Sequence, residues 1–120
     1  MIRMNILIEI ATLTVLATAN ASAASIENGR ELAVEACGAC HKVTQQQKTP
    51  VPVAEGSDGT YVEAPTFAQI AARCLAAQDL HARIAYPHYP MREQELMPLD
   101  FDNLAAYIQS LSSRSVCPIP

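Results

Sequence analysis

The feature that most constrains this chain is the run Cys37-Gly38-Ala39-Cys40-His41. On a turn of helix, side chains three positions apart lie on the same face, so both sulfurs can reach one edge of a flat ligand. The imidazole follows the second cysteine directly, and the two residues between the cysteines are small enough to let the backbone approach. This is the C-x-x-C-H spacing of a c-type haem attachment site, in which two thioethers hold the porphyrin and the histidine binds iron.

Two other kinds of site use paired cysteines. Zinc needs two further thiolate or imidazole ligands, usually a second closely spaced pair, whereas Cys74 and Cys117 are far apart in the sequence. A thioredoxin-like dithiol lies in a βαβ unit, and the sequence shows no strand-rich segment. The motif therefore favours one covalently bound haem c, attached through Cys37 and Cys40, with His41 as an iron ligand.

The first residues have the three parts of a secretory signal. Arg3 is a positive n-region, Ile6 to Thr18 an apolar h-region, and Ala21-Ser22-Ala23 the small residues before a cleavage site. A buried N-terminal helix or an uncleaved anchor is the alternative, supported by Glu9 inside the apolar stretch. We expect a signal peptide over residues 1–23, one domain over residues 24–120 and a periplasmic location. Export agrees with haem attachment, which takes place outside the cytoplasm.

Composition excludes several classes of function. The 120 residues carry 8 Lys plus Arg against 12 Asp plus Glu, a formal charge of −4. Nucleic-acid binding relies on clustered basic side chains, so this role is disfavoured. The apolar run near the N-terminus is shorter than the roughly 20 residues of a membrane-spanning helix, so no membrane span is expected in the mature chain.

Apolar spacing, caps and breakers predict three or four helices. They cover about 26–36 with Ser25 as N-cap, 65–74 opened by Pro65, 76–85, and a last helix that begins near Asp100 as N-cap. The last helix carries Phe101, Leu104, Ile108 and Leu111 at intervals of three and four residues. Residues 42–64 are polar and rich in turn formers, and are predicted to be a long loop.

The order of these pieces resembles a class I c-type cytochrome, a small monohaem cytochrome c, over nearly all of residues 24–120. The matching segments are Gly29-Arg30-Glu31-Leu32-Ala33, Cys37 to His41, Ala64-Pro65-Thr66-Phe67, His88-Tyr89-Pro90-Met91 and Ala105 to Leu111. The resemblance implies an all-α cytochrome c fold of three to four helices around one haem. It also implies that the N- and C-terminal helices cross, with Gly29 against Tyr107, since a residue without Cβ lets an aromatic ring approach the facing backbone.

In this family a proline carbonyl accepts the Nδ1 hydrogen of the haem-ligating histidine and fixes its tautomer. The loop between His41 and Ala64 is longer than in compact members of the family. Of its two prolines, Pro50 is favoured over Pro52 for this role.

The sixth ligand of the iron has four candidates in the mature chain, namely Met91, Met97, His81 and His88. Met91 follows Pro90 in a stiff loop and lies 16 residues before Tyr107, the interval usual for the axial methionine of this family. Met97 lies only 10 residues before Tyr107 and is expected to pack in the core. His88 is expected on the loop surface or near a propionate, and His81 on the outer face of a helix. We therefore expect Met91 to be the ligand.

A haem held by an imidazole and a thioether has no open coordination position, which favours electron transfer over catalysis. The resemblance implies a periplasmic electron carrier rather than an enzyme, a monomer that meets redox partner proteins in transient complexes. The alternatives are a haem-bearing subunit of a periplasmic dehydrogenase or oxidase complex, or a five-coordinate gas-binding haem protein. The sequence identifies neither the electron donor nor the acceptor.

Cys74 and Cys117 remain once the haem has taken the other two thiols. An oxidising compartment permits a disulfide between them, and closing a loop of about 43 residues would stabilise the fold by roughly 4 kcal/mol. Two free thiols, or an exposed Cys117 on a frayed tail, are the alternative. We expect the disulfide.

Overall fold

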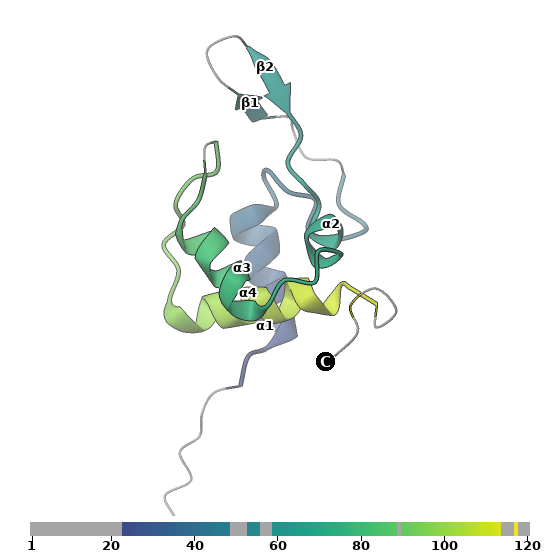
Figure 1. Ribbon diagram of the computed structural model, residues 1–120, viewed down its shortest axis with the longest axis vertical. Helices are drawn as coiled ribbons and strands as arrows, with labels where there is room; N and C mark the ends of the chain where they lie inside the picture. The colour runs from purple at the N-terminus through teal and green to yellow at the C-terminus, as the bar shows by residue number, and fades with distance from the viewer. Residues whose placement is uncertain (1–22, 49–52, 56–58, 89, 114–116, 118–120) are drawn as a thin grey trace, which may run out of the picture.

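The computed structural model describes residues 23–48, 53–55, 59–88, 90–113 and 117. The first helix, α1 (Ile26–Leu32), continues directly into a π-helical turn, η1 (Ala33–Cys37). Ser25 is the N-cap, and its hydroxyl accepts the amide hydrogen of Asn28 at 3.2 Å. The predicted helix and its cap are confirmed, and the turn ends at the first cysteine of the motif (Figure 1).

The last helix, α4 (Pro98–Ser110), buries one face in the core. The buried side chains on it include Leu104, Tyr107 and Ile108. The prediction of Asp100 as N-cap is wrong, because the helix begins earlier, with Met97 in that position. Asp100 is instead the third residue of the helix, where its carboxylate accepts the amide hydrogen of Met97 at 2.8 Å. Pro98 fits the first turn because no amide hydrogen is needed there.

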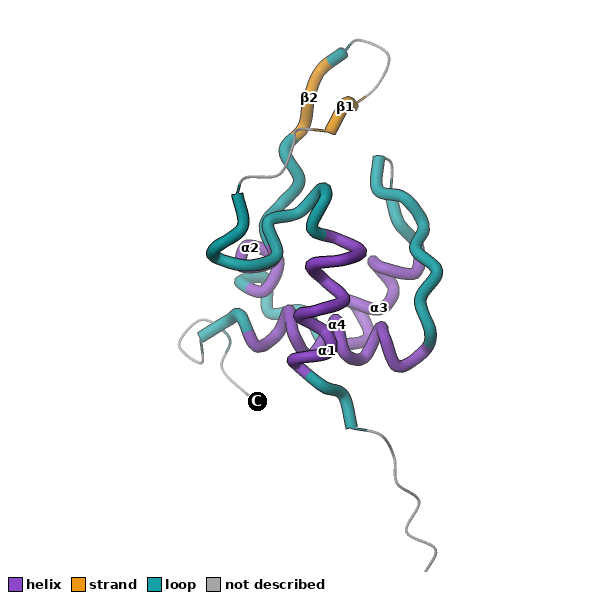
Figure 2. Tube along the Cα trace, turned by 180° about the vertical axis from the view of Figure 1, so that it is seen from behind, coloured by secondary structure: helices purple, strands orange, loops and turns teal. Residues whose placement is uncertain are grey.

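Helices α1 and α4 pack against each other at Gly29 (Figures 1 and 2). A Cβ atom built on Gly29 would collide with the backbone carbonyl of Asn103 and lie 2.9 Å from Tyr107 Cβ. The side chain of Asn103, buried in this contact, accepts the amide hydrogen of Ser25 at 2.7 Å. The predicted meeting of Gly29 and Tyr107 is confirmed, and the closest approach is to the backbone one turn before the tyrosine.

Two shorter helices complete the helical body. Helix α2 (Phe67–Ala71) has Thr66 as N-cap and a reciprocal contact with Gln69, so the helix begins after Pro65 rather than at it. It also ends earlier than the predicted residue 74, since the amides of Arg73 and Cys74 bond only three residues back, to Ile70 and Ala71, and Cys74 has a left-handed backbone with φ of 53°. Helix α3 (Ala77–Ala85) agrees with its prediction and buries Leu80.

The predicted long loop contains a small antiparallel hairpin. Strand β1 (Val53–Glu55) pairs with β2 (Thr60–Val62), with Ala54 opposite Tyr61. Gly59, at φ of 76°, begins the return to β2 with a conformation that glycine adopts without steric cost. The hairpin projects away from the helices (Figures 1 and 2). The sequence does not predict this hairpin, because two three-residue strands are too short for an alternating pattern to be recognised.

The predicted disulfide is confirmed. Cys74 and Cys117 are bonded, with their Cα atoms 5.3 Å apart. The bond links the segment after α2 to the chain that follows α4, across a sequence separation of 43 residues.

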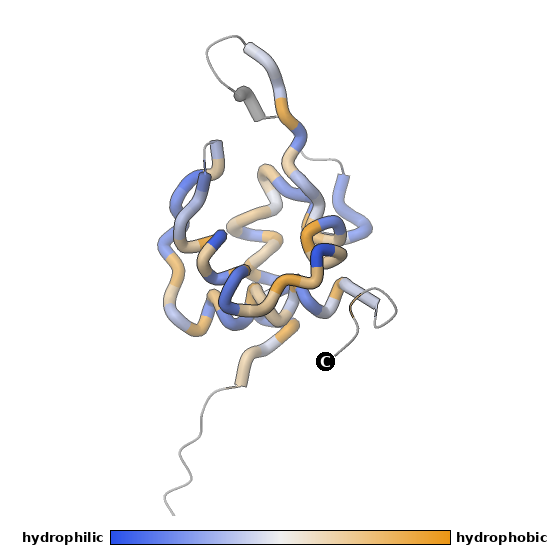
Figure 3. Tube along the Cα trace, in the orientation of Figure 1, coloured by the Kyte–Doolittle hydropathy of each residue, from blue (hydrophilic) through white to orange (hydrophobic). Residues whose placement is uncertain are grey.

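Polar and apolar residues alternate along the helices rather than forming one long apolar segment (Figure 3). None of the helices in the described part of the chain is both long and apolar enough to cross a membrane. The predicted signal peptide lies outside the described residues except for Ala23.

Candidate functional site

The C-x-x-C-H motif begins at Cys37, the last residue of η1, and forms a tight turn. The amide hydrogens of Cys40 and His41 both point to the carbonyl of Cys37, at N–O distances of 3.1 and 2.9 Å. Gly38 is required here because a Cβ on it would collide with the carbonyl oxygen of Val34. The turn therefore brings the two cysteines and the histidine onto one short, compact segment, as the spacing predicts.

Neither cysteine of the motif is in a disulfide, and they differ in environment. Cys37 is half-buried and Cys40 is exposed. Burial, together with the neighbouring Cys40, raises the pKa of the Cys37 thiol to about 11. The Cys37 thiol is therefore protonated near pH 7.

His41 has a fixed tautomer. Its Nδ1 lies 2.7 Å from the carbonyl oxygen of Pro65. A carbonyl can only accept, so Nδ1 carries the hydrogen, and the neutral ring keeps its lone pair on Nε2 for a metal. The ring of Phe67 lies at 5.6 Å between centroids and limits how the imidazole can turn.

The carbonyl that fixes this tautomer does not come from the proline expected for it. Pro50 and Pro52 lie outside the described residues, and the contact with His41 is made by Pro65. Pro65 directly precedes the cap of α2, and the amide of Phe67 donates to the carbonyl of Lys42 at 3.0 Å. Two hydrogen bonds therefore join the segment 65–67 to the end of the motif, a tertiary contact that no sequence spacing reveals.

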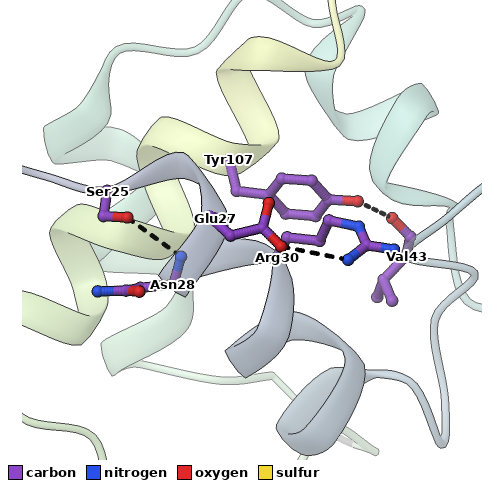
Figure 4. A network of polar contacts seen from close by, with 6 residues as sticks. All are labelled: Ser25, Glu27, Asn28, Arg30, Val43 and Tyr107. Atoms are coloured by element: carbon purple, nitrogen blue, oxygen red, sulfur yellow. Dashed lines mark hydrogen bonds and ion pairs between the residues drawn. The ribbon is translucent and has the colours of Figure 1, made fainter.

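The aromatic side chains continue from the motif to α4. The rings of Phe67 and Tyr107 lie 6.3 Å apart between centroids. The hydroxyl of Tyr107 donates to the carbonyl of Val43 at 2.6 Å (Figure 4). Burial raises the pKa of this phenol, although the Arg30 guanidinium opposes the shift. Helix α4 thus holds the chain two residues after the motif histidine.

The model of the family described as Cytochrome c matches residues 26–112. The chain belongs to the cytochrome c family. Comparisons with curated proteins and with solved structures found no match.

Cytochromes c carry a covalently attached haem c with iron, usually a single one, and generally act as electron carriers rather than enzymes. The motif of this cytochrome fits that group on two counts. It offers two unbridged cysteines, and an imidazole whose hydrogen bond through Nδ1 leaves Nε2 to bind iron. Domains of this family are also usually exported.

The candidates for the sixth ligand lie in different surroundings. Met91 is half-buried, and its amide donates to the carbonyl of His88 at 2.8 Å, which closes a turn. Met97 is 70% exposed as the N-cap of α4, so the expectation that it packs in the core is wrong. His88 is exposed, as expected.

His81 differs from its expected outward orientation. It is half-buried between α3 and α4, with Nε2 3.2 Å from Asp102 Oδ1 and its ring 6.1 Å from that of Phe101. These contacts engage the imidazole with α4. Of the two methionines, Met91 is therefore the half-buried one, and the imidazole of His81 already contacts α4.

Proposed function

We propose that this cytochrome is a periplasmic electron carrier. Cys37 and Cys40 hold the haem through thioethers, and His41 and Met91 ligate its iron. The bound haem supplies a centre that takes up and releases one electron at a time. The observation that carries the proposal is the hydrogen bond from His41 Nδ1 to Pro65 at 2.7 Å, because it prepares Nε2 as a metal ligand beside two unbridged cysteines.

The arrangement of the elements supports Met91 as the second ligand. The loop that carries Met91, between α3 and α4, and helix α2 stand on opposite sides of the α1–η1 helix in both views (Figures 1 and 2). A turn closed by the Met91 amide and bracketed by Pro87 and Pro90 restricts the backbone, so a side chain can be aimed at low entropic cost. The thioether sulfur is uncharged, which favours ferrous iron and raises the reduction potential.

The protein's own residues keep the site constant between oxidation states. Pro65 holds the imidazole ring, and Phe67 limits its rotation. Helices α1 and α4, which we propose to cross as in the family, are held together at Gly29 and Asn103, and α1 continues through η1 into the motif. Ligands that stay in place keep the reorganisation on electron transfer small.

Charge favours a particular class of partner. The formal charge of −4 attracts a redox protein with a basic patch and suits brief, partly electrostatic docking. We therefore expect a monomer that forms transient complexes with a donor and an acceptor, with association rates that fall as salt is added.

Absorption spectra of the purified protein, oxidised and reduced, test the proposal. We expect low-spin spectra in both states, a sulfur–iron charge-transfer band in the oxidised protein, and no change when carbon monoxide meets the reduced protein. A reduced protein that binds carbon monoxide at once has an open coordination position, and this result would reject the His41–Met91 ligand pair.

A further inference from the structure

The side chain of Gln47 forms hydrogen bonds with backbone groups at and beside the haem motif, and no sequence pattern predicts them. Its side-chain nitrogen, Nε2, lies 2.6 Å from the carbonyl oxygen of Gly38 and 2.8 Å from that of His41. Its side-chain oxygen accepts the amide hydrogen of Val43 at 2.8 Å. One side chain therefore binds backbone groups before, at and after the end of the motif.

These backbone groups need partners from outside the helix. Carbonyls in the last turn of a helix and just beyond it have no amide ahead of them to accept from, and water or a side chain must supply the hydrogen. The helical segment ends at Cys37. The carbonyls of Gly38 and His41 fall in this region, and the two hydrogens of one amide group satisfy both.

Val43 connects this arrangement to the rest of the fold. Its side chain is buried, its amide hydrogen is bound by Gln47, and its carbonyl is bound by Tyr107 of α4. The motif is thus tied to α4 through Gln47 and Val43, and separately to the segment before α2 through Pro65. The first tie holds the backbone of His41, and the second holds its ring.

The neighbouring residues provide an internal comparison. Gln45 and Gln46 have the same side chain, but both are exposed, whereas Gln47 is half-buried. By hydropathy the whole segment is strongly hydrophilic (Figure 3). Composition alone therefore describes all three as surface glutamines, and only the fold separates Gln47 from the others.

We propose that Gln47 is a positioning residue for the haem ligand: its carboxamide clamps the Cys37–His41 turn and sets the position from which His41 binds iron. The proposal rests on the function proposed above. Gln47 does not touch the iron. It acts through the backbone of His41, so its loss should change the properties of the haem as well as the stability of the protein.

The wild-type protein itself allows the first test. In haem-loaded protein we expect the side-chain amide hydrogens of Gln47 to exchange with solvent roughly tenfold more slowly than those of Gln45 and Gln46, the ratio for one protected hydrogen bond. Nuclear magnetic resonance resolves the three side-chain amides separately. Equal exchange at all three would overturn the clamp, and this measurement requires no variant to fold.

The second test compares Gln47→Glu with Gln46→Glu. Both changes add one negative charge at neighbouring positions. Only the first removes the two donors and places a carboxylate against two carbonyls, while keeping an acceptor for the Val43 amide. We expect Gln47→Glu to have a lower reduction potential than Gln46→Glu, because a looser turn admits water, which favours ferric iron. The paramagnetically shifted resonances of the His41 ring should move only in Gln47→Glu.

The outcomes separate this inference from the proposed function. If the wild type carries covalent haem, but the two glutamate variants have the same potential and the same His41 resonances, the clamp is overturned and the carrier role stands. If Gln47→Glu does not retain haem, the side-chain amide exchange rates of Gln45, Gln46 and Gln47 in the wild type decide whether the clamp exists. A wild type without covalent haem would overturn both proposals.

Discussion

Replacing Gly29 by alanine is the most direct perturbation of the contact between α1 and α4. A Cβ at this position would lie 2.6 Å from the carbonyl carbon of Asn103 and 2.9 Å from Tyr107 Cβ. Carbon atoms in contact are ordinarily about 3.5–4.0 Å apart. The two helices must therefore separate by roughly 1 Å, since one neighbour is a backbone atom and the other is the first atom of a side chain, and neither can rotate away.

The expected cost follows from three contributions. Overpacking of a tight contact costs about 1–3 kcal/mol. Loss of the hydrogen bond between Ser25 and Asn103 adds about 1 kcal/mol, and the better helix propensity of alanine returns about 0.5–1 kcal/mol. We expect a net loss of about 2 kcal/mol in the free energy of unfolding, which lowers the melting temperature by roughly 8–16 °C.

Chemical and thermal unfolding, followed by circular dichroism, measure this change. Asn28→Ala is the matched control, because Asn28 is exposed on the same helix and contributes only its backbone amide to the cap. We expect that variant to stay within about 0.5 kcal/mol of the wild type. If Gly29→Ala is as stable as Asn28→Ala, the account of the α1–α4 contact is wrong.

Three further predictions concern ligation, the disulfide and pH. Met91→Ala should remove the sulfur–iron charge-transfer band, lower the reduction potential and allow carbon monoxide to bind, and Met97→Leu should do none of these; spectra with the opposite pattern would assign the ligand to Met97. Reducing the bond between Cys74 and Cys117, or replacing both residues by serine, should cost about 4 kcal/mol in unfolding by denaturant; an unchanged midpoint would contradict this. Because the pKa of Tyr107 is raised in the folded protein, its contribution to stability is complete below the ordinary tyrosine pKa of about 10 and is lost as pH rises further. Tyr107→Phe lacks the hydrogen bond to Val43, so its free energy of unfolding should be roughly 1 kcal/mol lower at pH 7 and should decline less above pH 10 than that of the wild type. An equal decline in both proteins would refute the assignment of this pH dependence to Tyr107.

Local patterns predicted the parts of this fold whose causes are local. The C-x-x-C-H run needs only five consecutive residues, and the apolar face of α4 repeats over enough turns to be recognised. Ser25 was identified as a cap because its hydroxyl acts on an amide only three residues ahead. The disulfide was predicted by elimination, since the other two cysteines belong to the motif.

The features that the sequence did not predict depend on contacts between distant segments. The partner of His41 Nδ1 is Pro65, 24 residues away, whereas the sequence favours Pro50, because position along the chain does not show which proline carbonyl reaches the ring. The start of α4 was misplaced because both Asp100 and Met97-Pro98 are compatible with a first turn, and only the reciprocal hydrogen bonds show which residue caps it. The role of Gln47 cannot be predicted, because nothing in its local sequence distinguishes it from Gln45 and Gln46.

The central claim is that Cys37 and Cys40 hold a haem covalently. Mass spectrometry of the purified protein, unfolded and reduced, tests it most directly. The account predicts a mass equal to the processed polypeptide plus one haem, with the haem on the peptide that contains both cysteines, and neither cysteine open to alkylation. A haem-free polypeptide with both of these thiols open to alkylation would contradict it.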